Sequence, residues 1–170
     1  MILNIYKNTI KVYFLVFFIS HLMAGKDLVM EKILAEVGIS SIIEKNNDVI
    51  IDIYSINKAP IAGVQFEIEP KGLFAIDSIS GGRCADAGFE LYSNKKGVLL
   101  GFSLSGKLIS KSKSNNIKDN ILFSAYGKKT APIPSEPITL KTTLAGKSGK
   151  KINSKSNQYI YKKKIDLNKQ

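Results

Sequence analysis

The sequence predicts an all-β protein, specifically an antiparallel β-sandwich of the jelly-roll type with about nine strands. Short apolar runs recur at intervals of about 8–12 residues, and turn residues rather than long helices separate them. Several runs alternate apolar and polar residues, which places one side of a strand in a core and the other in solvent. Within residues 89–104, two strand patterns flank a hairpin loop closed by Gly97.

The expected strands begin in the first third of the chain. Two β-branched runs, residues 39–43 and 49–54, flank the polar residues 44–48, which have the composition of a hairpin loop. Residues 61–69 alternate most cleanly, with Phe66 on the apolar side. The remaining expected strands are residues 73–79, 89–92, 98–104, 121–126 and 138–145, with a last one beginning at Ile152.

Three segments do not follow the strand pattern. Residues 27–37 form either a short helix capped by Asp27 or the approach to a first strand. Residues 83–88 are expected to form one helical turn that ends at Gly88. The Ser-, Lys- and Asn-rich residues 106–119 are expected to form a flexible loop.

Residues 1–24 have the features of a signal peptide, with Lys7 and Lys11 before an apolar run at 12–23 and small residues at the cleavage site. The run is shorter than the roughly 20 residues that cross a bilayer, so cleavage is expected, with an uncleaved anchor as the alternative. Either outcome makes the protein secreted, extracellular or attached to the cell surface. The expected organisation is signal peptide 1–24, linker or short leading helix 25–36, sandwich 37–152 and lysine-rich tail 153–170.

The amino-acid composition limits the kinds of functional site that the chain can form. The only histidine, His21, lies in the expected signal peptide, so the mature chain has no imidazole for catalysis or zinc binding. A single cysteine, Cys84, cannot form an internal disulfide and is expected to be buried. The net charge is +11, but it comes from lysines with a single arginine, which argues against a specific nucleic-acid site. No enzyme activity is therefore expected.

Three sequence elements occur in a characteristic order. They are Pro-Ile-Ala-Gly-Val-Gln-Phe at residues 60–66, Gly81-Gly82 followed by Ala-Gly-Phe at 87–89, and Leu-Leu-Gly-Phe-Ser at 99–103. In this order they resemble cohesin-like modules over residues 37–152. The resemblance implies a nine-stranded jelly-roll sandwich, and either binding of dockerin modules through a sheet face or, as in related sandwiches, binding of polysaccharides. The Lys/Ser/Asn stretch after Ile109 departs from the family pattern, and no partner-contacting residue can be carried over.

The candidate ligand-binding residues are polar or half-exposed positions. Gln65, Glu67 and Glu69 line the polar side of one strand, and their alternative role is a merely solvated face. The half-exposed candidates are Tyr54, Tyr92 and Tyr126, whose alternative is a ring in the core with its hydroxyl at the rim. The chain has no tryptophan, and its phenylalanines 66, 89, 102 and 123 are expected in the core.

No catalytic residue, metal site or cofactor is expected. A glycosidase pair of Glu67 with Asp52 or Asp77 would need a cleft that the pattern does not indicate. Asp48 and its two preceding asparagines offer oxygen ligands for calcium, but a tight turn explains the same residues.

The sequence thus predicts an exported, non-catalytic binding module in an extracellular assembly, with a dockerin-like protein module or a polysaccharide as its partner. The alternative is a structural or surface-attachment subunit that its basic tail holds to anionic envelope polymers. Membrane contact is expected only through residues 1–24, and only if they stay uncleaved.

Overall fold

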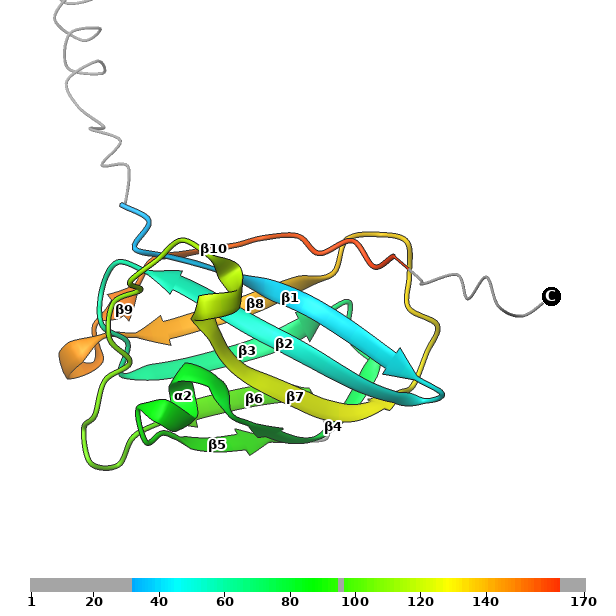
Figure 1. The fold of residues 1–170 in the computed structure, drawn as a ribbon, viewed down its shortest axis with the longest axis horizontal. Helices are drawn as coiled ribbons and strands as arrows, with labels where there is room; N and C mark the ends of the chain where they lie inside the picture. The colour runs from blue at the N-terminus through cyan, green and yellow to red at the C-terminus, as the bar shows by residue number, and fades with distance from the viewer. Residues whose placement is uncertain (1–31, 95–96, 163–170) are drawn as a thin grey trace, which may run out of the picture. The chain divides into compact units, whose positions relative to one another are not determined.

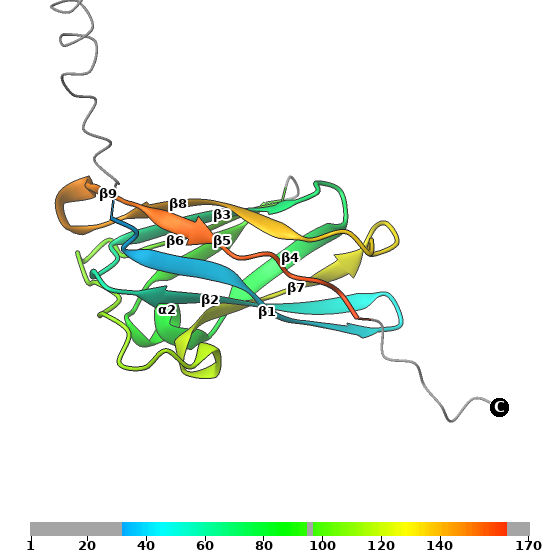
Figure 2. The same cartoon turned by 90° about the horizontal axis from the view of Figure 1, so that it is seen from above.

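The computed structural model describes residues 32–94 and 97–162. Within these residues, ten strands form two five-stranded sheets that pack face to face (Figures 1 and 2). The first sheet has the order β10-β1-β2-β7-β4, and the second has the order β5-β6-β3-β8-β9. The predicted all-β sandwich is confirmed, with ten strands where about nine were expected.

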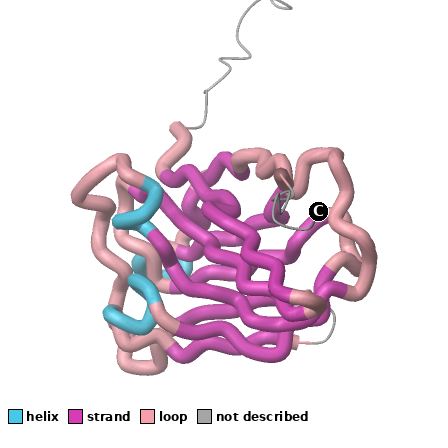
Figure 3. Tube along the Cα trace, turned by 45° about the vertical axis from the view of Figure 1, so that its right-hand side comes forward, coloured by secondary structure: helices cyan, strands magenta, loops and turns pink. Residues whose placement is uncertain are grey.

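The strands are β1 Ala35–Lys45, β2 Asp48–Asn57, β3 Gly63–Glu69, β4 Phe74–Ser80, β5 Glu90–Ser93, β6 Val98–Phe102, β7 Ile121–Lys129, β8 Thr139–Ala145, β9 Lys151–Ile152 and β10 Ser154–Ser156. Three short helices are α2 Gly82–Asp86, η1 Ile117–Asn120 and η2 Lys147–Gly149. Figure 3 shows that the helices gather toward one end of the sandwich.

The predicted turns lie where the sequence places them. Asn46 adopts a positive φ of 57° in the tight turn between β1 and β2, a conformation that asparagine tolerates better than most residues. Gly97 has φ 80° before β6, and Gly88 has φ 68° just after α2. The described part of residues 27–37 leads into β1, so the strand alternative holds there.

One strand pair is parallel, which an antiparallel jelly roll does not predict. β10 pairs with the start of β1, with Ala35 opposite Ser154 and Val37 opposite Ser156. Beyond β10, the backbone of Tyr159 exchanges two hydrogen bonds of 2.8 Å with Ile138. The sandwich therefore extends past its expected end at residue 152, and residues 153–162 lie along it. Residues 163–170 of the expected tail, like the expected signal peptide, are outside the described residues.

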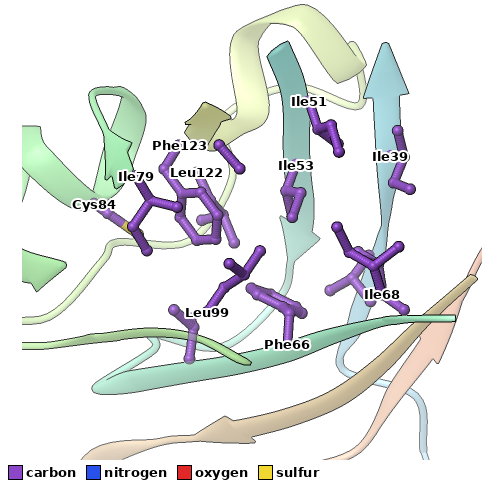
Figure 4. Packing of buried hydrophobic residues seen from close by; sticks show 14 of the residues in the cluster. Ile39, Ile51, Ile53, Phe66, Ile68, Ile79, Cys84, Leu99, Leu122 and Phe123 are labelled. Atoms are coloured by element: carbon purple, nitrogen blue, oxygen red, sulfur yellow. The ribbon is translucent and has the colours of Figure 1, made fainter. Parts of the chain in front are cut away.

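The core lies between the two sheets (Figure 4). Phe66 from β3 and Phe123 from β7 are fully buried, with ring centroids 5.9 Å apart and an interplanar angle of 57°. Cys84 and Phe89 are buried as expected, whereas Phe102 is only half-buried because it points to the outside of the second sheet. No helix in the described part of the chain has the length and apolarity to span a membrane.

Candidate functional site: the outer face of the second sheet

The outer face of the second sheet carries side chains from four neighbouring strands. Strand register places Tyr92, Leu100, Gln65 and Thr143 in one row across β5, β6, β3 and β8. Phe102 lies in the next row toward the end of β6, and Val98, Glu67 and Lys141 form the row on the other side. We call this surface the open face; its members are Gln65, Glu67, Tyr92, Val98, Leu100, Phe102, Lys141 and Thr143.

An aromatic pair lies at one side of the open face. Tyr92 is 49% exposed, and its ring stacks on that of Phe102 with centroids 5.7 Å apart and an interplanar angle of 17°. The Tyr92 hydroxyl donates a 2.5 Å hydrogen bond to the Glu90 carboxylate, and this bond raises the pKa of Tyr92. The stack and the hydrogen bond together hold both rings in place on the surface.

The opposite side of the open face is charged. The Glu67 carboxylate lies 2.9 Å from the Lys71 ammonium and 3.5 Å from that of Lys141. The hydrogen bond from Lys71 is the main cause that lowers the pKa of Glu67. Exposed ion pairs contribute little to the stability of the fold. Here they place charges of both signs next to the apolar side chains of the open face.

The structure brings together four of the six candidate ligand-binding residues. Gln65, Glu67 and Tyr92 belong to the open face, and Glu69 follows at the end of β3, opposite Thr139. Their role as ligand contacts stays a prediction.

Tyr54 and Tyr126 lie on the first sheet instead. Tyr54 is only 3% exposed, because its ring packs against Gly38 and its hydroxyl accepts a 2.9 Å hydrogen bond from the Asn157 amide. This burial corresponds to the alternative that the sequence left open for the tyrosines. Tyr126 is 39% exposed, opposite Ile50 of β2.

The sole arginine organises the loops at one end of the sandwich, a role that the sequence analysis missed. One terminal nitrogen of Arg83 donates to the Ser55 carbonyl at 2.9 Å, to the Asn57 amide oxygen at 2.9 Å and to the Asn120 amide oxygen at 3.0 Å. The other donates to the Ser110 carbonyl at 2.6 Å. Burial lowers the pKa of Arg83. The only signal in the sequence was a lone arginine directly after two glycines.

These contacts also order the loop expected to be flexible. Ile109 is 1% exposed, and its backbone pairs with Ile61 through hydrogen bonds of 3.0 and 2.8 Å. The Ser112 amide donates to the Asn57 carbonyl at 2.9 Å. Polar composition alone suggested mobility, but one apolar anchor and the buried guanidinium fix this segment.

The described residues do not bring together the groups of the other candidate catalytic and metal sites. Burial raises the pKa of the Cys84 thiol to about 12, so the thiolate needed for nucleophilic attack does not form near neutral pH. Glu67 lies on the second sheet and both Asp52 and Asp77 on the first, so the sheets separate the imagined glycosidase pair. No group of three or more His, Cys, Asp or Glu side chains able to hold a metal occurs among residues 32–94 and 97–162.

No protein-family model and no curated protein matches the chain. Among solved structures, the chain is similar to the third ScaB cohesin of R. flavefaciens, whose structure is a complex with a group 1 dockerin. The two chains are 17% identical, the match covers 72% of this chain and 89% of that one, and the TM-score is 0.47.

Proposed function

We propose that the chain is an exported, non-catalytic binding module of the cohesin-like type and that it binds a dockerin-like protein module on the open face. The observation that supports this proposal is the stacked pair of Tyr92 and Phe102 beside hydrogen-bonding side chains on an uncovered sheet face. Binding energy at protein interfaces concentrates in a few aromatic and apolar residues within a polar surround. The order of the three sequence elements that resemble cohesin-like modules is consistent with the same function.

The geometry favours a protein partner over a polysaccharide. Sugar rings stack on exposed aromatic faces, and the stacking of Tyr92 on Phe102 already covers one face of each ring. Leu100 and Val98 add aliphatic surface next to them, which suits apolar side chains of a partner more than hydroxyl groups. Gln65 and Lys141 then supply hydrogen bonds and charge around this patch.

The test measures binding of residues 25–170 to purified dockerin modules encoded in the same genome, by isothermal titration calorimetry. The decisive variant is Tyr92→Ala, which removes half of the aromatic stack. We expect it to weaken binding by tenfold or more, an effect of about 1.4 kcal/mol or above, as for a central interface tyrosine.

The matched control is Tyr126→Ala, which removes the exposed tyrosine of the first sheet. It should change the affinity by no more than about twofold. Equal weakening by both substitutions, or no binding to any of the dockerins, contradicts the proposal. Retention on insoluble cellulose or xylan that Tyr92→Ala abolishes would instead assign the open face to a polysaccharide.

A further inference from the structure

Lysines crowd one end of the sandwich. Two segments that flank the start of β3 carry them. One is the loop after β6, with Lys107, Lys111 and Lys113, and the other is the β8–β9 connection with Lys147 and Lys150, followed by Lys151 at the start of β9. The segments lie together because Ile61 pairs with Ile109 while the Ala62 amide donates to the Ala145 carbonyl at 2.7 Å. We call these six lysines the basic end; it is the left end in Figure 1.

The six lysines outnumber the carboxylates beside them: Asp86 and Asp119 line a pocket with Lys111 and Lys113, and no ion pair to any of the six occurs among the described residues. All six lysines are exposed. The three ion pairs among the described residues involve Lys71, Lys129 and Lys141, which lie toward the opposite end of the sandwich. An excess of like charges raises the electrostatic free energy of the free protein, and an anionic surface relieves that repulsion.

Exposed apolar side chains accompany these lysines. Leu104 is 78% exposed, the largest value among the exposed large apolar residues of the described chain, and lies in the tight turn that ends at Gly106. Ile117, at the start of η1, is 38% exposed, and Ile33, just before β1, is 43% exposed. Lysines around a protruding leucine match the chemistry of a bilayer interface, where anionic headgroups lie above an apolar layer.

The same residues argue against a nucleic acid. Phosphate recognition favours arginine, whose planar fork binds two oxygens at once. The only arginine, Arg83, already donates its hydrogen bonds to Ser55, Asn57, Ser110 and Asn120. An exposed leucine also gives nothing to a phosphate backbone.

We propose that the basic end docks onto a membrane surface rich in anionic phospholipids, with Leu104 entering the headgroup region. The first described residues add to this end, where Ile33 lines a pocket with Lys58 and Asn115.

This inference is independent of the proposed partner. The strands run along the long axis of the sandwich, away from the basic end, so the open face stays accessible in a docked molecule (Figures 1 and 2). The basic C-terminal region is also divided by the fold: Lys147 and Lys150 lie at the basic end, whereas Lys162 lines a pocket with Glu44 and Asn46 at the opposite end.

The test is co-sedimentation of residues 25–170, which include the whole buried core, with phosphatidylcholine vesicles containing or lacking about a quarter phosphatidylglycerol. We expect binding to the anionic vesicles only. The affinity should fall more than tenfold between about 0.05 and 0.5 M salt, because the Debye length shrinks below the charge separation. Equal binding to neutral vesicles overturns the proposal.

Two triple variants test whether binding depends on where the lysines lie or only on the net charge of the protein. Lys107→Glu, Lys111→Glu and Lys113→Glu reverse three charges at the basic end, and Lys45→Glu, Lys128→Glu and Lys162→Glu reverse three exposed charges elsewhere. Each surface lysine contributes about fivefold to such binding. The first triple variant should therefore lose more than tenfold in affinity and the second at most about threefold. Equal losses, with both variants folded by circular dichroism, contradict the proposal.

Leu104→Ser tests the membrane itself. We expect about a fivefold loss of vesicle binding, because a partly buried leucine returns to water, with no change in the dependence on salt. Unchanged binding would show that the basic end adsorbs to any polyanion, and the membrane-docking proposal would then be wrong.

Discussion

The two sheets share one hydrophobic core, but the side chains on their outer faces differ in their exposure and in their hydrogen-bond partners. On the first sheet, Asp52 accepts hydrogen bonds from Ser41 at 2.8 Å and Ser124 at 2.6 Å, and Tyr54 is covered. On the second sheet, Tyr92 stays half-exposed above the strands. A face whose polar groups bind one another across three strands contributes to stability, whereas a face with a stacked pair of aromatic rings beside aliphatic side chains has contacts to offer a partner.

The largest expected effect comes from the interior that both faces share. Phe66→Ala removes a fully buried ring that contacts Phe123 of the other sheet. We expect a loss of about 3–5 kcal/mol in the free energy of unfolding, since the lost transfer energy and the new cavity add. Urea denaturation measures it. A loss below about 1 kcal/mol would mean that the sheets do not depend on one another for packing.

A change confined to the outer face of the first sheet should act on that sheet alone. A Cβ atom added at Gly38 would lie 2.9 Å from the Tyr54 ring, so Gly38→Val crowds a residue that cannot move outward without losing its hydrogen bond to Asn157. We expect the free energy for local opening of β1 and β2 to fall by about 1–3 kcal/mol. Hydrogen exchange should speed up in β1 and β2 while β3 and β6 keep their protection. Equal acceleration in both sheets would show that the faces are not independent.

The buried thiol makes the stability of the shared interior dependent on pH. The pKa of Cys84 is raised by burial from 9.0 to about 12, so between these values the unfolded chain releases a proton that the folded chain retains. Unfolding therefore becomes easier as pH rises above 9, by about 1.4 kcal/mol per pH unit. Below pH 9 this contribution is constant. Cys84→Ala should show a shallower fall in unfolding free energy between pH 9 and 11, and parallel curves would contradict the assignment.

The local features of the fold were predictable because each has a local cause. Alternation over residues 61–69 follows directly from the pleat of β3, which buries Val64, Phe66 and Ile68. The turn at Asn46 requires a positive φ that few residue types tolerate. For this reason the strands and the hairpins were predicted well.

What escaped prediction depends on contacts between distant residues. β10 is the polar sequence Ser-Lys-Ser, whose only reason to be a strand is the free edge of β1. Alternation also places a tyrosine on the outside of a strand without saying which sheet that strand joins. Tyr54 and Tyr92 were therefore grouped together, although Gly38 and Asn157 enclose one and the other lies in the open.

The smallest expected effect compares one carboxylate from each outer face. Asp52→Ala leaves the hydroxyls of Ser41 and Ser124 without their acceptor on a partly buried surface, and we expect a cost of about 1 kcal/mol. Glu67→Ala removes exposed ion pairs with Lys71 and Lys141 and should leave the denaturation midpoint unchanged, because solvent and salt screen such pairs. Binding to the dockerin probes should reverse the order, with Asp52→Ala neutral and Glu67→Ala weaker. If Glu67 instead proves the more important residue for folding, the distinction between a stabilising face and a binding face fails.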